Sequence, residues 1–278
     1  MSAPRMGALH GEHVLLGASF APSETSGLLR VSSYAHESAE GAGAVLADLT
    51  GAAYLLASGP DAAVFAGSAL AGRRLAVGEV ALEAALNGTG GLVSVPLLVR
   101  TGDTEHVIVD ASGRADALAA WLAFLAGARA QDDRAAFPEL ELADASDMLV
   151  PLLLAGPEAS HVLSDYVGDK NDLPAPGTVR QLKLDAIPVV VAHVAAPFAP
   201  PAYLVLVPAG AARILWRSFL SFTEVAPVGL EWVAERVSER CPWGEALGRA
   251  EARCSRDELE AWGVVRDADD FVGARALV

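Results

Sequence analysis

A short motif that occurs twice constrains the fold of this chain more than any other feature. Residues 58–62 read Ser-Gly-Pro-Asp-Ala, and residues 155–159 read Ala-Gly-Pro-Glu-Ala. Each copy follows an apolar run typical of a buried strand and precedes a segment with helical spacing of apolar residues. A proline and an acid suit the first turn of a helix, where N–H groups lack partners and the helix dipole is positive. The repetition predicts two similar α+β halves that share a core, with coincidence in an alanine-rich chain as the alternative.

The stretch between the two copies indicates where the halves are joined. Residues 130–147 are charged and interrupted by proline, which is typical of a connection. We therefore expect one domain over residues 1–278, with halves at about 9–130 and 148–248. The remaining residues, 249–278, form a charged tail with one amphipathic piece.

Local patterns predict the elements of the first half. The polar, glycine- and serine-rich residues 28–45 indicate a loop or a short, poorly packed element, and the apolar run 46–57 indicates one strand. The further elements expected are a helix from Pro60 through Leu70, a hairpin of residues 92–99 and 106–111, and a helix over residues 115–129.

The second half is expected to continue with strands and then helices. Strands are predicted near residues 179–194 and 202–208, and helices near residues 209–222 and 230–240. Residues 187–212 carry no charge apart from His193, which is long enough to raise the question of a membrane span. Five prolines in this stretch are incompatible with a lipid-exposed helix, so we interpret it as strands and turns.

Composition excludes several classes of function. The chain has 35 acidic and 20 basic side chains, a formal net charge of −15, so neither nucleic acid nor an anionic membrane is an expected partner. With 53% hydrophobic and 20% charged residues, it is too apolar for a disordered chain. Two cysteines, Cys241 and Cys254, are too few for a disulfide scaffold or a cysteine-based zinc site. The first residues lack the apolar segment of a secretory signal, which predicts a soluble cytoplasmic protein.

Motifs for metals and nucleotides are absent from the sequence. His10 and His13 are three residues apart, but no third ligand is spaced to complete a metal site, so no metal is predicted. The sequence has no phosphate-binding loop, dinucleotide fingerprint or serine-hydrolase elbow.

Several phrases, taken in their order along the chain, resemble one known family. The phrases are His-Val-Leu-Leu-Gly-Ala at 13–18, Ala-Ser-Gly-Pro-Asp-Ala at 57–62, Gly-Gly-Leu at 90–92, Val-Ile-Val-Asp-Ala-Ser-Gly at 107–113, Leu-Ala-Gly-Pro-Glu-Ala at 154–159, Val-Leu-Val-Pro at 205–208 and Pro-Val-Gly-Leu at 227–230. Over residues 9–248 this succession resembles the folate-binding N-terminal domain of the glycine-cleavage T-protein (aminomethyltransferase) superfamily. The resemblance implies an α+β fold of two interlocked ferredoxin-like halves around a central channel, which holds tetrahydrofolate in the family. Too few residues follow position 248 for the family's C-terminal barrel.

The chain departs from the family at the polar positions that hold the cofactor. Where the family has Gly-Gly-apolar-x-Asp-Asp, with a carboxylate that steers the folate chemistry, residues 90–95 read Gly-Gly-Leu-Val-Ser-Val. The family's pterin-binding Gly-aromatic-Glu corresponds to Ala-Tyr-Leu at 202–204, and its Gly-Leu-x-x-Arg-Asp to Gly-Leu-Glu-Trp-Val-Ala at 229–234. The asparagine of Val-x-Asn-Ala corresponds to Asp110. Losing these anchors costs about 1–3 kcal/mol each and disfavours tetrahydrofolate as a cofactor.

We therefore expect a divergent enzyme whose channel binds another small, apolar molecule and performs a cyclisation, rearrangement or group transfer. The alternatives are a non-catalytic subunit of a multimeric oxidase and a folate-dependent aminomethyl or one-carbon transferase. The sequence leaves open whether the protein forms a homo-oligomer or a hetero-oligomer. The expected catalytic residues are Asp110, His193 and Glu231, and the expected substrate-binding residues are Ser94, Val95, Tyr203, Leu204, Trp232 and Val233.

Each candidate also has a purely structural interpretation. Asp110 suits a turn or helix cap, and His193 suits a core or edge histidine with a backbone partner. Glu231 suits a solvated acid at a helix start, beside a core tryptophan. Tyr203 suits a side chain that fills former cofactor space, and Ser94 has no recognisable base beside it in the sequence.

Overall fold

The chain folds into two compact units, each assembled from two separate stretches of sequence. The computed structural model describes residues 4–37, 39–130, 132–194 and 201–277. The first unit comprises Met1–Ala52 and Ala145–Arg240, and the second comprises Ala53–Asp144 and Cys241–Val278.

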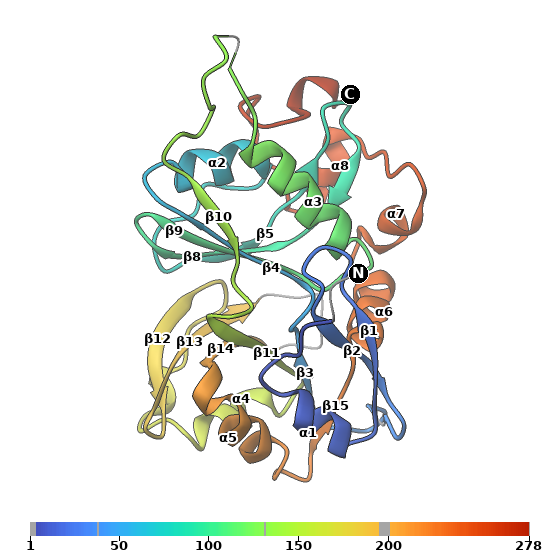
Figure 1. Ribbon diagram of the computed structural model, residues 1–278, viewed down its shortest axis with the longest axis vertical. Coiled ribbons are helices and arrows are strands. Elements are labelled where there is room, and N and C mark those ends of the chain that lie inside the picture. Colours follow the sequence, from blue (N-terminus) through green and yellow to red (C-terminus); the bar gives the residue numbers. More distant parts are fainter. Residues whose placement is uncertain (1–3, 38, 131, 195–200, 278) are drawn as a thin grey trace. The chain divides into compact units, whose positions relative to one another are not determined.

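The second unit is built on a five-stranded antiparallel sheet with two helices on one face (Figure 1). Its strands, in sheet order, are β10 (Glu141–Asp144), β4 (Ala53–Ser58), β9 (Glu105–Asp110), β8 (Leu97–Gly102) and β5 (Val80–Leu82). The helices are α2 (Ala62–Ala69), after β4, and α3 (Ala115–Ala126), after β9. Leaving aside the short β5, the path β4-α2-β8-β9-α3-β10 is the ferredoxin-like βαββαβ order.

The first unit repeats this path on a six-stranded mixed sheet. Its strands, in sheet order, are β12 (Val179–Leu184), β13 (Ile187–Val194), β14 (Ala202–Pro208), β11 (Leu149–Ala155), β3 (Ala44–Asp48) and β15 (Val225–Pro227). The helices α4 (Ala159–Ser164) and α5 (Ala209–Phe219) cover one face of the sheet (Figure 1). Here β3, from the start of the chain, occupies the place beside β11 that β10 occupies beside β4.

The two units therefore exchange strands along the sequence. β3 pairs with β11 in the first unit, and the chain then passes through residues 49–52 into β4 of the second unit. β10 pairs with β4, and the chain passes through residues 145–148 into β11. The predicted α+β fold is confirmed. The two compact units do not coincide with the predicted halves, 9–130 and 148–248, because each unit takes residues from both. The division into halves describes the order of elements along the sequence and stays a prediction.

The glycine of each repeated motif lies where an exchanged strand enters its sheet. Gly156 has φ of +137°, and a Cβ there would lie 2.5 Å from the carbonyl oxygen of Gly43, just before β3. Gly59 has φ of +100°, and its Cβ would lie 2.1 Å from the carbonyl oxygen of Glu139, just before β10. Only glycine fits both the backbone conformation and the space.

Smaller elements complete the two units. In the first unit these are α1 (His10–Leu15), the hairpin of β1 (Ala18–Pro22) and β2 (Leu29–Tyr34), the 3₁₀ turn η1 (Lys170–Asp172), and α6 (Leu230–Arg240), which packs against β2. In the second unit these are the paired strands β6 (Ala85–Leu86) and β7 (Leu92–Ser94), the helices α7 (Gly244–Gly248) and α8 (Arg256–Ala261), and η2 (Ala274–Ala276).

Several sequence predictions about local structure are confirmed. The helices α2, α3, α5 and α6, the strand β9 and the strands β11 to β14 all occur within a few residues of their predicted bounds. The run 92–99, predicted as the other strand of the hairpin, is divided between β7, which pairs with β6, and the start of β8, which forms the hairpin with β9. Part of the uncharged stretch 187–212 forms β13 and β14, and its residues 195–200 lie outside the described ones. None of the described helices is long and apolar enough to cross a membrane.

Three predictions about the strands were wrong. Residues 28–45, predicted as a loop or a short, poorly packed element, contain all of β2 and the start of β3, because Val31 and Tyr34 bury their side chains despite the serines between them. The apolar run 46–57 is two strands, because residues 49–52 turn through Gly51 at φ of +85°. The connection 130–147 contains β10, whose short polar sequence is stabilised by pairing with β4.

The charged tail is docked on the second unit through Arg266. Its guanidinium donates to the carbonyl oxygens of Gly67, Leu70 and Gly72, at the C-terminal end of α2 and just beyond it. A cation at this end of a helix satisfies unpaired carbonyls and complements the dipole.

Glu83 is buried beside this docking point. It is 2% exposed, and within the described part of the chain its Oε1 has no hydrogen-bond partner. Burial raises the pKa of Glu83 to about 8, although the charges of Arg266 and Arg73 and the backbone N–H of Gly72 oppose the shift.

We predict that Gly156→Ala destabilises the first unit. The methyl group would meet the Gly43 carbonyl and force the backbone out of φ +137°, at a cost of about 1–3 kcal/mol or more. Gly210→Ala is the control, because Gly210 lies in α5 with open space around its Cβ and alanine favours helix. Urea unfolding measures both variants, and equal stability of the two would contradict the close approach.

We also predict a pH-dependent effect of Glu83→Gln. The folded pKa of Glu83, about 8, exceeds its ordinary 4.5, so the folded protein keeps a proton that the unfolded chain has released between these values. The free energy of unfolding therefore falls as pH rises through this window, by on the order of a few kcal/mol. Glu83→Gln should flatten that decline, whereas the exposed Glu105→Gln should not. Urea unfolding at several pH values between 4.5 and about 8 measures both variants. If the free energy of unfolding falls equally in both, the raised pKa of Glu83 would be refuted.

Candidate functional site

Asp110 and Ser94 form a buried polar pair in the second unit. Asp110 is the last residue of β9, and Ser94 is the last residue of β7; their exposed fractions are 4% and 0%. The Ser94 hydroxyl donates to Asp110 Oδ2 at 2.5 Å and lies 3.2 Å from the Ser112 hydroxyl. Strands that are distant in sequence thus bring two predicted site residues into direct contact.

The second carboxylate oxygen of Asp110 closes a turn. The backbone N–H of Ser112 donates to Asp110 Oδ1 at 2.8 Å, and the Ser112 hydroxyl accepts from the backbone N–H of Arg114 at 3.1 Å. These bonds lead the chain from β9 into α3, as the structural interpretation of Asp110 requires. Asp110 therefore fills the turn role and still presents one oxygen to Ser94.

Burial dominates the electrostatics of this pair. It raises the pKa of Asp110, and the hydrogen bonds from Ser94 and Ser112 oppose that shift. Burial, and then the charge of Asp110, also raise the pKa of Cys241 to about 12. Cys241 accordingly stays a thiol at neutral pH and is unsuited to act as a nucleophile. Val95, beside Ser94, is buried and apolar.

His193 and Tyr203 form a second contact, in the first unit. They are directly paired across β13 and β14, with ring centroids 4.4 Å apart. The hydroxyl groups of Tyr203 and Ser160 are 2.9 Å apart, and His193 Nδ1 lies 3.0 Å from the carbonyl oxygen of Pro174. Because a carbonyl only accepts, Nδ1 carries the proton and Nε2 is the basic nitrogen of the neutral ring. His193 thus has the backbone partner of its structural interpretation.

The remaining predicted residues lie on β14 and α6 of the first unit. Leu204 and Val233 have apolar side chains that are almost fully buried, so neither position offers a polar side-chain group to a ligand. Glu231 is exposed in the first turn of α6, and the guanidinium of Arg236 lies 5.5 Å from the ring centre of Trp232. This matches the interpretation of Glu231 as a solvated acid at a helix start.

The nine predicted residues are divided between the two units. Ser94, Val95 and Asp110 belong to the second unit, and the other six belong to the first. The structure brings together Ser94 with Asp110 and His193 with Tyr203. Their membership of one common site stays a prediction.

Sequence reasoning missed a buried network around His13 in the first unit. His13 Nε2 lies 2.9 Å from Asp48 Oδ2, and His13 Nδ1 lies 2.8 Å from the Tyr34 hydroxyl. The backbone N–H of Thr50 donates to Asp48 Oδ1 at 2.9 Å, and the His13 ring lies nearly perpendicular to the Trp216 ring, with centroids 4.8 Å apart. Since a carboxylate only accepts, Nε2 donates to Asp48 and Nδ1 of the neutral ring accepts from Tyr34.

The His13 network holds α1, β2 and β3 together, and burial raises the pKa of Tyr34. No spacing rule links positions 13, 34 and 48, and the only sequence signal was the presence of His13 in the phrase at 13–18. The described residues contain no group of three or more potential metal ligands.

We predict that Ser94→Ala raises the pKa of Asp110 further. The hydroxyl stabilises the charged form, and its loss leaves a buried carboxyl oxygen without its donor, at about 1–3 kcal/mol. Because the folded pKa of Asp110 exceeds its ordinary value, the free energy of unfolding falls as pH rises through that window, and Ser94→Ala extends the window upward. An NMR titration of ¹³C-labelled aspartates, assigned with Asp110→Asn, measures the shift. The distant Ser68→Ala is the control and should leave the Asp110 titration unchanged. The same titration in Ser94→Ala would show that the bond from Ser94 does not affect the pKa of Asp110.

Comparison with known proteins gives the chain a family. Among solved structures, aminomethyltransferase T of the glycine cleavage system from Bartonella henselae has a TM-score of 0.66 at 23% identity, over 98% of this chain and 73% of that chain. The heterotetrameric sarcosine oxidase from Corynebacterium sp. U-96 has a TM-score of 0.46 at 18% identity, over 78% of this chain and 93% of that chain. No curated protein sequence matches significantly. The model of the GCVT N-terminal domain matches residues 10–236, which confirms the resemblance found in the sequence. The chain belongs to the GCVT N-terminal domain family.

Proposed function

We propose that this chain is a T-protein-like enzyme that binds a small, largely apolar molecule and uses Asp110 as its acid–base group. The contact between Ser94 and Asp110 carries the proposal. Ser94 stands where the resemblance places the family's carboxylate, and Asp110 stands where it places an asparagine. The two positions are one hydrogen bond apart, so the carboxyl of Asp110 lies beside the position where the resemblance implies the family's carboxylate.

The surroundings of Asp110 suit proton transfer. A carboxyl whose pKa is raised by burial keeps its proton to a higher pH than an ordinary aspartate, so it can donate to a ligand heteroatom and then accept. The Ser94 hydroxyl and the Ser112 backbone N–H orient it and would support its charged form. This arrangement supports a cyclisation, rearrangement or group transfer in which one acid–base group and a shaped site suffice.

The residues at the other cofactor positions do not fit tetrahydrofolate. The resemblance places a glutamate at Leu204 and an arginine at Val233, and both side chains here are apolar and almost fully buried. A pterin would leave its hydrogen-bonding groups unpaired against them, at about 1–3 kcal/mol each. We therefore assign no step to folate.

Native mass spectrometry and calorimetry test this proposal. We predict that the purified protein carries a small molecule, that Asp110→Asn loses it, and that tetrahydrofolate does not bind with micromolar affinity. Asparagine keeps the Oδ1 acceptor of the turn, so Asp110→Asn should still fold. Glu105→Gln is the matched control, because Glu105 is an exposed acid at the start of the same strand.

Three outcomes would overturn the proposal. Micromolar binding of tetrahydrofolate that Asp110→Asn abolishes would establish a folate-dependent transferase. If Asp110→Asn retained the small molecule, Asp110 would not be part of the binding site. Purification with a flavoprotein and without any small ligand would establish a non-catalytic subunit.

A further inference from the structure

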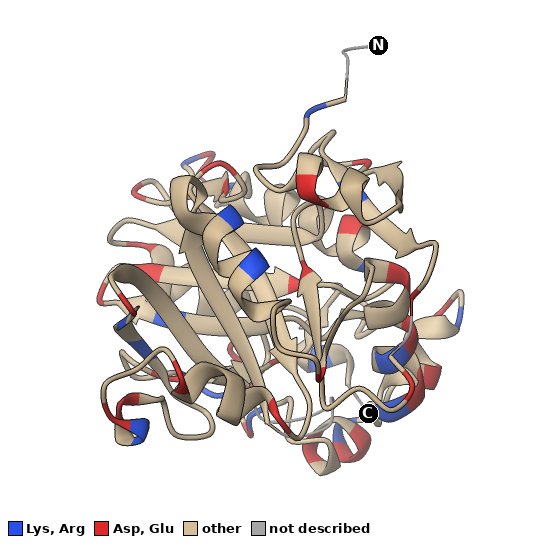
Figure 2. Cartoon of the chain, turned by 90° about the horizontal axis from the view of Figure 1, so that it is seen from below, with Lys and Arg blue, Asp and Glu red and all other residues tan. Residues whose placement is uncertain are grey.

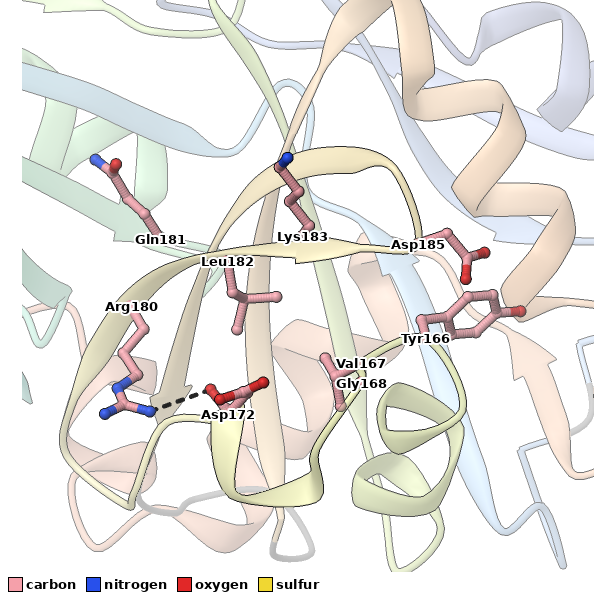
Figure 3. A pocket seen from close by; sticks show the side chains of 9 residues that line it. All are labelled: Tyr166, Val167, Gly168, Asp172, Arg180, Gln181, Leu182, Lys183 and Asp185. Carbon is pink, nitrogen blue, oxygen red and sulfur yellow. Dashed lines mark hydrogen bonds between the residues drawn. The ribbon is translucent and has the colours of Figure 1, made fainter.

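A cleft in the first unit runs along the outer edge of β12 (Figure 3). It has a volume of about 590 Å³, and the segment 166–172, which follows α4, forms its opposite wall. Leu182 points from β12 toward Val167 and Gly168 across the middle of the cleft, whereas Gln181 and Lys183 point to the other side of the strand. Leu182 and Val167 also pack against the core, so the floor of the cleft is apolar and fixed.

The backbone of β12 is open toward this cleft. Among the strands that the structure describes, β12 is at the edge of its sheet and pairs with β13 alone. The N–H of Asp185 points away from β13 and donates to the carbonyl oxygen of Tyr166 at 2.8 Å. In an antiparallel strand the outward groups recur at every second residue, so Lys183 and Gln181 present theirs to the same edge. Among the described residues, no backbone hydrogen bond joins either of them to the segment 166–172.

Two contacts close the ends of the cleft and leave its middle free. At one end, Asp185 N–H bonds to Tyr166, and at the other the Arg180 guanidinium donates to the carbonyl oxygens of Asn171 and Asp172. Between them lies a stretch of unpaired strand edge next to an apolar floor. Such an edge accepts an added strand, which contributes main-chain hydrogen bonds while its side chains provide specificity.

The charges favour a basic occupant. The Arg180 guanidinium is engaged with backbone carbonyls and keeps its positive charge, and Lys183 points away, so the anionic groups at the two ends are the carboxylates of Asp172 and Asp185. Asp185 also raises the pKa of Tyr166, after burial, which places its charge beside that ring. Over the whole chain acidic residues outnumber basic ones, 35 to 20 (Figure 2), which adds a long-range attraction for cations.

We propose that the β12 cleft binds an extended peptide segment of a partner protein, with an apolar side chain between two basic ones. The peptide backbone pairs with Gln181 and Lys183. Its apolar side chain packs on Leu182 and Val167, and its basic side chains, two residues to either side, reach Asp172 and Asp185. This interaction is separate from the Asp110 site, because Asp110 lies in the other unit.

Fluorescence anisotropy with a labelled peptide Lys-Thr-Val-Thr-Lys and the full-length protein tests this proposal. Period-two alternation places the valine and both lysines on one face of an extended strand. We predict that Glu-Thr-Val-Thr-Glu, and the lysine peptide with N-methylated threonine and valine amides, bind at least about tenfold more weakly. The double variant Asp172→Asn, Asp185→Asn should weaken the lysine peptide similarly. Asparagine tolerates the φ of +52° at position 185, so the hairpin should persist.

A variant of the strand edge tests the backbone pairing itself. Gln181→Pro removes an outward N–H at an edge position, where proline is tolerated, and Gln181→Ala keeps the N–H as the control. Binding should fall in the first and persist in the second, with circular dichroism confirming that both fold. Failure of the lysine peptide to bind, equal binding of all three peptides, or equal binding by both variants would overturn the proposal.

Discussion

Backbone pairing of β3 with β11, and of β10 with β4, is the interaction on which the rest of the structure depends. Both pairs join stretches that are far apart in the sequence, as Asp48 with Leu152 and Ser58 with Glu141. In each pair, the incoming strand begins beside a glycine that no other residue could replace. At Gly156 and Gly59 the backbone runs at positive φ against a carbonyl oxygen of the incoming stretch. Without these contacts β11 and β4 would each present an unpaired edge, and the chain could not pass from one unit to the other and back.

The buried polar groups of both units follow from where strands end. Asp48 ends β3 and Asp110 ends β9, and the two aspartates are used in the same way. One oxygen accepts the backbone N–H two residues on, from Thr50 or Ser112, and the other accepts from a buried side chain of a distant element, His13 or Ser94. Both carboxyl groups are therefore oriented by turn and partner together, which is what a buried acid needs to remain in place. In the His13 network the outcome is a structural tie, and in the Asp110 pair it is the acid on which the proposed chemistry rests.

Local sequence predicted the elements whose signals lie within a few residues. The Pro-acid start of α2, the helical spacing in α3 and the strand β9 are read correctly, because caps and periodicity are local. Two strands with polar sequences were not predicted. β2 and β10 have polar sequences that indicate loops, and they are strands because neighbouring backbone pairs with them. The candidate site divides in the same way, since Asp110 and Ser94 were named from the sequence, whereas their contact, and the network of His13, required the fold.

The sequence by itself determined the α+β class, the repeated strand–glycine–proline–acid–helix unit and the family, because composition, periodicity and motif order are properties of the chain. Only the tertiary structure decided which strands pair across the repeat. It also decided that the acid at position 110 lies one hydrogen bond from the serine at position 94, and that the edge of β12 is left open. The physical reason is that hydrogen-bond pairing and burial join residues by distance in space, and a strand's partner is not encoded in its own residues.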